Sequence, residues 1–178
     1  MEKSSPIKIG IIGAESTGKS ELCEALAKHY NTVWVPEYAR QYFNNSDIYN
    51  YTQEDLITIA KKQIANENEL IKKANRFLFC DTTLITLKIW AELEFKQTPD
   101  FILENLGIIK YDHYFIMANE VPWMQDAQRQ NKFSRNMIFD MNKAEVEKLK
   151  APYTIINGLN EERPNNAIKI IDKLNLSS

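Results

Sequence analysis

Residues 13–20 read Gly-Ala-Glu-Ser-Thr-Gly-Lys-Ser, a stretch that fits the pattern G-x-x-x-x-G-K-[ST] at every constrained position. An apolar run, residues 7–12, precedes it, and apolar side chains follow it at helical spacing: Leu22, Ala25, Leu26 and Tyr30. A strand, a loop and a helix therefore meet in the order that a phosphate-binding loop requires. We favour this interpretation over a glycine-bearing turn with a stray lysine, because the sequence on both sides agrees with it.

The residue types of this loop predict how it binds phosphate. Gly13 and Gly18 let the backbone curl so that successive N–H groups point inward, at the positive end of the following helix. We expect the Lys19 ammonium to contact the β- and γ-phosphates of ATP, and the Ser20 hydroxyl to hold Mg²⁺. The predicted nucleotide-binding residues are those of the loop itself: Gly13, Ala14, Glu15, Ser16, Thr17, Gly18, Lys19 and Ser20.

Length and composition limit the other possibilities. A chain of 178 residues favours a single domain, which we assign to residues 1–178. The balance of 22 Lys and Arg against 24 Asp and Glu gives no electrostatic footprint for nucleic acid or for an acidic membrane. We therefore expect a small-molecule partner, with no nucleic acid and no membrane, and leave the oligomeric state open.

The cysteines and the N-terminal residues indicate the cellular location of the protein. Cys23 and Cys80 have neither C-x-x-C nor zinc-ligand spacing, so we expect both to be small buried hydrophobic residues in a reducing environment. Residues 1–6 are polar and lack the apolar core of a signal peptide, and no stretch approaches membrane-spanning length. These features predict a cytoplasmic protein.

The rest of the chain alternates apolar, β-rich runs with helical patterns, which predicts an α/β fold with a mostly parallel sheet. Strands are expected near residues 7–12, 32–36, 76–80, 112–118 and 153–157. Helices are expected near residues 19–30, 38–44, 53–75, 83–95, 99–107, 136–150 and 164–174. The long helix begins at a spacing typical of a capping box, Thr52 to Asp55, and most of its charges are expected on a solvated face.

Two acidic residues follow predicted strands, where catalytic groups collect in a parallel sheet. Asp81 comes after four apolar residues, as expected of a carboxylate that holds a metal against the phosphates, although it could instead cap the next helix. Glu37 follows the strand near residues 32–36 and is a candidate general base for an acceptor hydroxyl, the alternative being a surface glutamate at a helix start.

A polar, basic segment follows the fourth predicted strand. Residues 122–135 read Pro-Trp-Met-Gln-Asp-Ala-Gln-Arg-Gln-Asn-Lys-Phe-Ser-Arg, in the place where small-molecule kinases carry a lid. Arg129, Lys132 and Arg135 are candidates to close over the triphosphate and neutralise charge during transfer, or else are ordinary exposed cations.

Taken together, these motifs resemble the kinase domain of NadR-type proteins, a P-loop NTPase family that phosphorylates nicotinamide riboside with ATP. The resemblance rests on the phosphate loop, Glu37-Tyr38-Ala39-Arg40, Asp81-Thr82 and Pro122-Trp123-x-x-Asp126-x-x-Arg129, in this order. It implies an NMP-kinase-like five-stranded parallel sheet of order 2-3-1-4-5, with helices on both faces and a lid near residues 120–135. It also implies ATP and Mg²⁺ as cofactors.

The motifs and the resemblance together predict roles for individual residues. Lys19, Glu37, Asp81 and Arg129 would be catalytic, Arg135 would bind ATP, and Ser20 and Asp81 would hold the metal. The riboside would contact Glu37, Tyr38, Arg40, Asp81, Trp123 and Asp126.

Two departures from the family concern the acceptor. Pro36 stands where an aromatic residue usually precedes the Glu-Tyr pair, and residues 53–75 contain no aromatic that could pack on a nicotinamide ring. The candidates to replace these rings are Trp34, Tyr38, Tyr42, Tyr51 and Trp90. Thr83 also stands where a second aspartate is expected after Asp81.

The sequence leaves more than one function class open. The first is an ATP:nucleoside phosphotransferase that makes nicotinamide mononucleotide or a similar nucleotide. The others are an ATP-binding regulatory module and a kinase for another nucleoside or a nucleoside monophosphate. An adenylyltransferase domain, found in longer relatives, is not expected, because neither His29 nor His113 lies in the required H/T-x-G-H turn.

Overall fold

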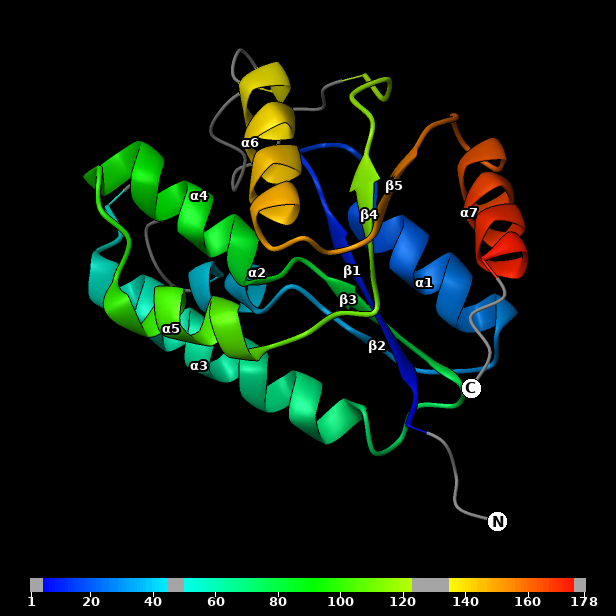
Figure 1. Ribbon diagram of the computed structural model, residues 1–178, viewed down its shortest axis with the longest axis horizontal. Coiled ribbons are helices and arrows are strands. Elements are labelled where there is room, and N and C mark those ends of the chain that lie inside the picture. The colour runs from blue at the N-terminus through cyan, green and yellow to red at the C-terminus, as the bar shows by residue number, and fades with distance from the viewer. Residues whose placement is uncertain (1–4, 45–49, 123–134, 175–178) are drawn as a thin grey trace.

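The computed structural model describes residues 5–44, 50–122 and 135–174 (Figure 1). The strands are β1 Ile7–Ile12, β2 Trp34–Val35, β3 Phe77–Asp81, β4 His113–Met117 and β5 Tyr153–Ile156. The helices are α1 Lys19–His29, α2 Tyr38–Phe43, α3 Gln53–Leu70, α4 Leu84–Phe95, α5 Asp100–Ile108, α6 Arg135–Lys148 and α7 Glu162–Lys173. None of the described helices has the length and apolar character needed to span a membrane.

The strands form one five-stranded sheet of order β2-β3-β1-β4-β5, and every pairing is parallel. The predicted fold class and strand order are therefore confirmed. Because β1 lies between β3 and β4, the chain leaves it at the point where the strand order reverses, which is where open α/β sheets bind ligands. The phosphate loop begins there.

Helices cover both faces of the sheet, with α1 and α7 on one face and α3, α4, α5 and α6 on the other (Figure 1). Alternate strand residues serve the two faces: Ile9 and Ile11 pack toward α1 and α7, and Ile12 packs with Ile85 and Ile89 of α4. Both faces of the central strands are therefore apolar, as expected of a buried parallel sheet.

Two elements are shorter than expected. β2 has two residues because Pro36 has no N–H to donate and because Thr32 bonds through its side chain, whose hydroxyl donates to the Phe77 carbonyl (2.7 Å). α3 ends at Leu70, after which Lys72 and Lys73 make tighter i to i+3 bonds and Arg76 takes a left-handed φ of 59°. The start of α3 is as predicted, because Thr52 and Asp55 form the reciprocal capping box.

One charge of α3 does not lie on the solvated face. Glu67 is 3% exposed, forms an ion pair with Lys8 and accepts a hydrogen bond from the Tyr111 hydroxyl (2.7 Å). This buried cluster lies away from the phosphate loop, and its partners come from segments distant in sequence. Cys23 and Cys80 are buried free thiols, as expected, and burial raises the pKa of each.

Candidate active site

The phosphate loop has the backbone geometry of an anion-binding nest. Ser16 and Gly18 have left-handed φ values of 57° and 78°, and Gly13 has a φ of 147°. A Cβ atom on Gly13 would lie 3.0 Å from the Cβ of Met117 on β4, so the loop packs too closely for a side chain there. The Thr17 hydroxyl donates to the Ala14 carbonyl (2.8 Å) and closes the turn.

Lys19 lies at the first position of α1, where the helix dipole is positive. Its ammonium donates to the carbonyl oxygens of Gly13 (3.2 Å) and Ala14 (2.9 Å), so it folds back across the loop. Positive charge and inward-pointing backbone N–H groups thus converge on one concave surface, which suits a polyphosphate.

Asp81 lies beside the loop because β3 pairs with β1 in the register Ile11 to Asp81. The Ser20 hydroxyl donates to its Oδ2 atom at 2.5 Å. The alternative that Asp81 caps the next helix is wrong, since the N-cap of α4 is Thr83, whose hydroxyl accepts from the Ile85 N–H (3.3 Å).

The environment of Asp81 makes its ionised form costly. The residue is 1% exposed, and its pKa is raised from 3.8 to about 6, first by burial and second by the negative charge of Glu37. Lys19, the Ser20 hydroxyl and Arg40 act in the opposite direction. A bound cation would stabilise the ionised form of this carboxylate, so the environment of Asp81 favours cation binding.

Glu37 emerges next to Asp81 because Val35 of β2 pairs with Cys80 of β3. Its side chain is only 11% exposed, and its Oε2 atom accepts from the Arg40 Nε–H (3.2 Å). The alternative of a surface glutamate is therefore wrong. Glu37 occupies the N-cap position of α2 without making a side-chain cap bond, and it is a lining residue of the site.

Two clefts meet at the loop. The first lies between α2, α4 and α6 and includes Phe43, Thr86, Trp90 and Asn142 in its lining. The second lies at the start of α1 and the ends of β2 and β3 and includes Ser20, Trp34, Pro36 and Asp81. Ser16, Lys19, Glu37 and Arg40 line both clefts. One ligand could thus approach Glu37 and Lys19 from each side.

Only some of the aromatic residues proposed to pack on a nicotinamide ring line a cleft. Trp90 lines the first cleft together with Phe43, which the sequence did not single out, and Trp34 lines the second. The rings of Tyr38, Tyr42 and Tyr51 pack in the cluster between α2, α3 and α4 instead. Tyr38 lines neither cleft, and its N–H donates to the Gln63 Oε1 atom (3.0 Å).

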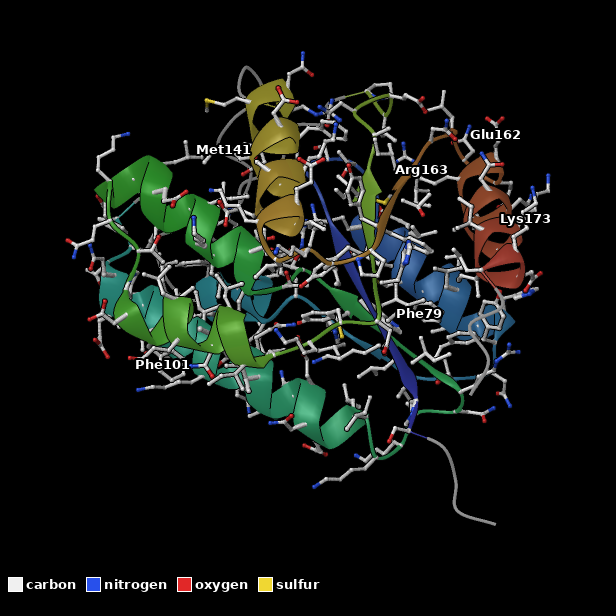
Figure 2. The ribbon with its side chains drawn as sticks, in the orientation of Figure 1. Phe79, Phe101, Met141, Glu162, Arg163 and Lys173 are labelled. Carbon is white, nitrogen blue, oxygen red and sulfur yellow. The ribbon has the colours of Figure 1, made fainter. Side chains whose placement is uncertain are left out.

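Arg163 is a buried cation of the loop region that sequence reasoning missed. Its guanidinium donates to three backbone carbonyl oxygens: Thr17, Ala118 at 3.2 Å and Gly158 at 2.8 Å. The residue is 4% exposed and lies near the start of α7, facing the end of β4 (Figure 2). The sequence did contain one indication of this role. A positive charge in the first turn of a helix is unfavourable next to the helix dipole, so an arginine at that position is expected to have a specific partner.

Arg135 is the first residue of α6, and its Nη2 atom donates to the Ser16 carbonyl (3.4 Å). It therefore contacts the phosphate loop, and its role in binding ATP stays a prediction. The other predicted lid residues, Trp123, Asp126, Arg129 and Lys132, lie outside the described residues.

The oxygen pair of Ser20 and Asp81 fits Mg²⁺. Mg²⁺ prefers oxygen ligands and is commonly held by one or two protein groups, with phosphate oxygens and waters completing the shell. Within residues 5–44, 50–122 and 135–174, no three His, Cys, Asp or Glu side chains gather in a way that could hold a metal without such help. The site thus fits a metal that arrives with a nucleotide.

The family model of AAA domains (AAA_28) matches residues 8–163, which is most of the chain. The chain belongs to this family. The trifunctional NAD biosynthesis/regulator protein NadR of Salmonella typhimurium is 26% identical to this AAA domain over 146 residues, which cover 76% of this chain and 35% of the relative. The chain thus spans about a third of that curated relative.

Solved structures show the same fold. A NadR protein in complex with NAD and AMP-PNP superposes with a TM-score of 0.77 at 18% identity, covering 98% of this chain and 51% of that one. A NadR protein in complex with NR gives a TM-score of 0.75 at 21% identity, covering 95% and 50%. The predicted resemblance to NadR-type P-loop domains is therefore confirmed.

Proposed function

We propose that this chain is an ATP-dependent nucleoside phosphotransferase whose acceptor is nicotinamide riboside and whose product is nicotinamide mononucleotide. The observation that carries the proposal is the junction of the two clefts at Lys19, Glu37 and Arg40. A phosphotransferase needs a phosphate cradle and a separate acceptor pocket that meet at a proton acceptor. A regulatory ATP-binding module needs only the cradle.

On the nucleotide side, the backbone N–H groups of the loop and the Lys19 ammonium bind the β- and γ-phosphates. Ser20 and Asp81 would hold Mg²⁺, which would neutralise charge on the phosphate oxygens. Arg135 adds a second cation through its contact with the loop. Residues 120–135 would form the lid, with Arg129 closing on the transferring group.

On the acceptor side, Glu37 takes the proton of the ribose hydroxyl as that oxygen attacks the γ-phosphorus. The bond between the γ-phosphorus and the bridging oxygen breaks, and ADP leaves with the electron pair. The Arg40 guanidinium holds the Glu37 carboxylate in position through its Nε–H bond. Because Glu37 is nearly buried, its carboxylate is shielded from water that would compete for the phosphoryl group.

The acceptor cleft suits a riboside with a cationic ring. Trp90 and Phe43 supply aromatic surface, and Glu15 and Glu37 supply negative charge. A pyridinium ring gains about 0.5–2 kcal/mol from an aromatic face. The match to a NadR structure with NR supports this choice of acceptor.

The test is a panel of acceptors incubated with ATP and Mg²⁺, with ADP formation as the readout. The panel contains nicotinamide riboside, common nucleosides, nucleoside monophosphates and no acceptor. We expect ADP formation that depends on nicotinamide riboside. Equal ADP release without any acceptor, or ATP binding without turnover, would contradict the proposal.

A further inference from the structure

Two residues that line the first cleft each carry a buried polar atom with no hydrogen-bond partner among the described residues. The atoms are the Oγ1 atom of Thr86 on α4 and the Oδ1 atom of Asn142 on α6, in residues that are 7% and 1% exposed. Buried polar groups are nearly always paired, because an unpaired one loses its hydration without compensation. Two of them on facing helices, lining one cleft, indicate a ligand that pairs them.

The hydrogen bonds of Asn142 define what that ligand must offer. Its Nδ2 group donates to the Ile138 carbonyl (2.8 Å), which fixes the orientation of the amide. The Oδ1 atom is therefore an acceptor and needs an N–H or O–H donor. The Thr86 hydroxyl can donate, so it suits a carbonyl oxygen next to that donor.

We propose that Thr86 and Asn142 recognise an amide edge on the ring of the acceptor. In this arrangement an N–H of the ligand's amide donates to Asn142 Oδ1, and the amide oxygen accepts from the Thr86 hydroxyl. The inference rests on the proposed function and adds to it the chemical group that the pocket selects. Trp90 and Phe43 line the same cleft and provide surface against which the ring packs.

This assignment predicts discrimination between two ribosides of the same size. Nicotinamide riboside carries a carboxamide, whereas its carboxylate analogue has no donor for Asn142 and adds a negative charge. Glu15 and Glu37 line the cleft and would repel that charge. A site that hydrogen-bonds its substrate rejects an analogue that cannot complete the bonds, because the buried groups stay unpaired.

A matched control exists in the same structure. Thr98, between α4 and α5, is 8% exposed, and its Oγ1 atom also has no partner within the part of the chain that the structure describes, but it lines neither cleft. Thr98→Val therefore makes the same chemical change as Thr86→Val at a comparable depth. Any effect specific to Thr86→Val must then come from the cleft.

The experiment compares kcat/KM for the carboxamide and the carboxylate ribosides in the wild type, Thr86→Val, Asn142→Leu and Thr98→Val. We expect the wild type and Thr98→Val to prefer the carboxamide by at least about tenfold, and Asn142→Leu to lose most of that preference. Thr86→Val should lower kcat/KM for both ribosides, because the oxygen of either one can accept from the Thr86 hydroxyl. The carboxylate riboside should be affected little by Asn142→Leu, because it has no donor for Asn142 Oδ1, although its oxygen can still accept from the Thr86 hydroxyl.

A wild type that uses both ribosides equally, an Asn142→Leu variant that keeps the full preference, or a Thr86→Val variant that behaves like Thr98→Val would overturn the inference. If no nucleoside is phosphorylated, the proposed function fails, and calorimetric binding of the two ribosides to the same four proteins decides the inference by itself. Equal affinity in the wild type would then overturn it, and a carboxamide preference that is lost in Asn142→Leu but kept in Thr98→Val would support it.

Discussion

Asp81 is buried, faces Glu37 and has a pKa raised to about 6. Above that pH the folded protein carries the full cost of the buried charge. As the pH falls through about 6 toward the ordinary value of 3.8, the folded state takes up a proton before the unfolded state does. The contribution of Asp81 to stability therefore increases on acidification, contrary to the usual behaviour of a salt-bridged carboxylate.

This sign can be measured on metal-free protein. We expect the free energy of unfolding of the wild type to rise relative to that of Asp81→Asn, by on the order of 1–2 kcal/mol, between about pH 7 and about pH 5. Denaturant titrations in a chelator at both pH values provide the free energies of unfolding. A wild type that gains no stability relative to Asp81→Asn on acidification, or that loses stability relative to it, would contradict the assigned environment of Asp81.

Lys19 provides a second test at the residue scale. Lys19→Ala removes the ammonium predicted to contact the β- and γ-phosphates, so phosphoryl transfer should fall strongly while the fold remains. Lys28→Ala, in the last turn of the same helix, is the matched control and should be close to wild type. Near-normal turnover in folded Lys19→Ala would refute the loop assignment.

The two acids should separate in their kinetics. Glu37→Gln keeps the shape of the side chain but removes the proton acceptor, so kcat should fall roughly 10²–10⁴-fold with ATP affinity largely kept. Asp81→Asn should instead shift the Mg²⁺ dependence to higher concentration. If both variants changed only KM and left kcat untouched, this division of roles would be wrong.

At the scale of elements, Arg163 joins α7 to the phosphate loop and to the ends of β4 and β5 through three carbonyl oxygens. These carbonyls come from segments that meet only in the folded chain. Since Gly18 lies next to this contact, where a Cβ atom would be 3.8 Å from Arg163 Nη1, the guanidinium also restricts where the loop can move. Arg163 is thus a positioning residue for the nest.

Replacing Arg163 by Met should leave buried carbonyls unpaired and cost about 2–4 kcal/mol of stability. KM for ATP should rise more than kcat falls, because the loop is no longer held while Glu37 is intact. Lys169→Met, on the exposed side of α7, serves as the control for loss of a cation from this helix. An unchanged KM in folded Arg163→Met would show that the contact is structural only.

At the scale of the whole molecule, the parallel sheet brings the site together, and this part was predictable. Strand periodicity and the loop motif placed Lys19, Glu37 and Asp81 at one edge, and the registers of β1, β2 and β3 confirm that arrangement. Arg163, Thr86 and Asn142 were not predictable from local pattern. Their roles depend on contacts between segments that are distant in the sequence, and the local pattern around a polar residue on a helix does not show what it will face in the fold.

The central claim is that the γ-phosphoryl group of ATP passes to the ribose hydroxyl of nicotinamide riboside. Its most direct test uses ATP labelled in the γ-phosphoryl group and follows the label by mass spectrometry. The wild type should place the label in nicotinamide mononucleotide, in equal amount to the ADP formed, whereas Glu37→Gln and the 5′-deoxy riboside should give almost none. Label found only in inorganic phosphate, or label transfer unaffected by Glu37→Gln, would contradict the account.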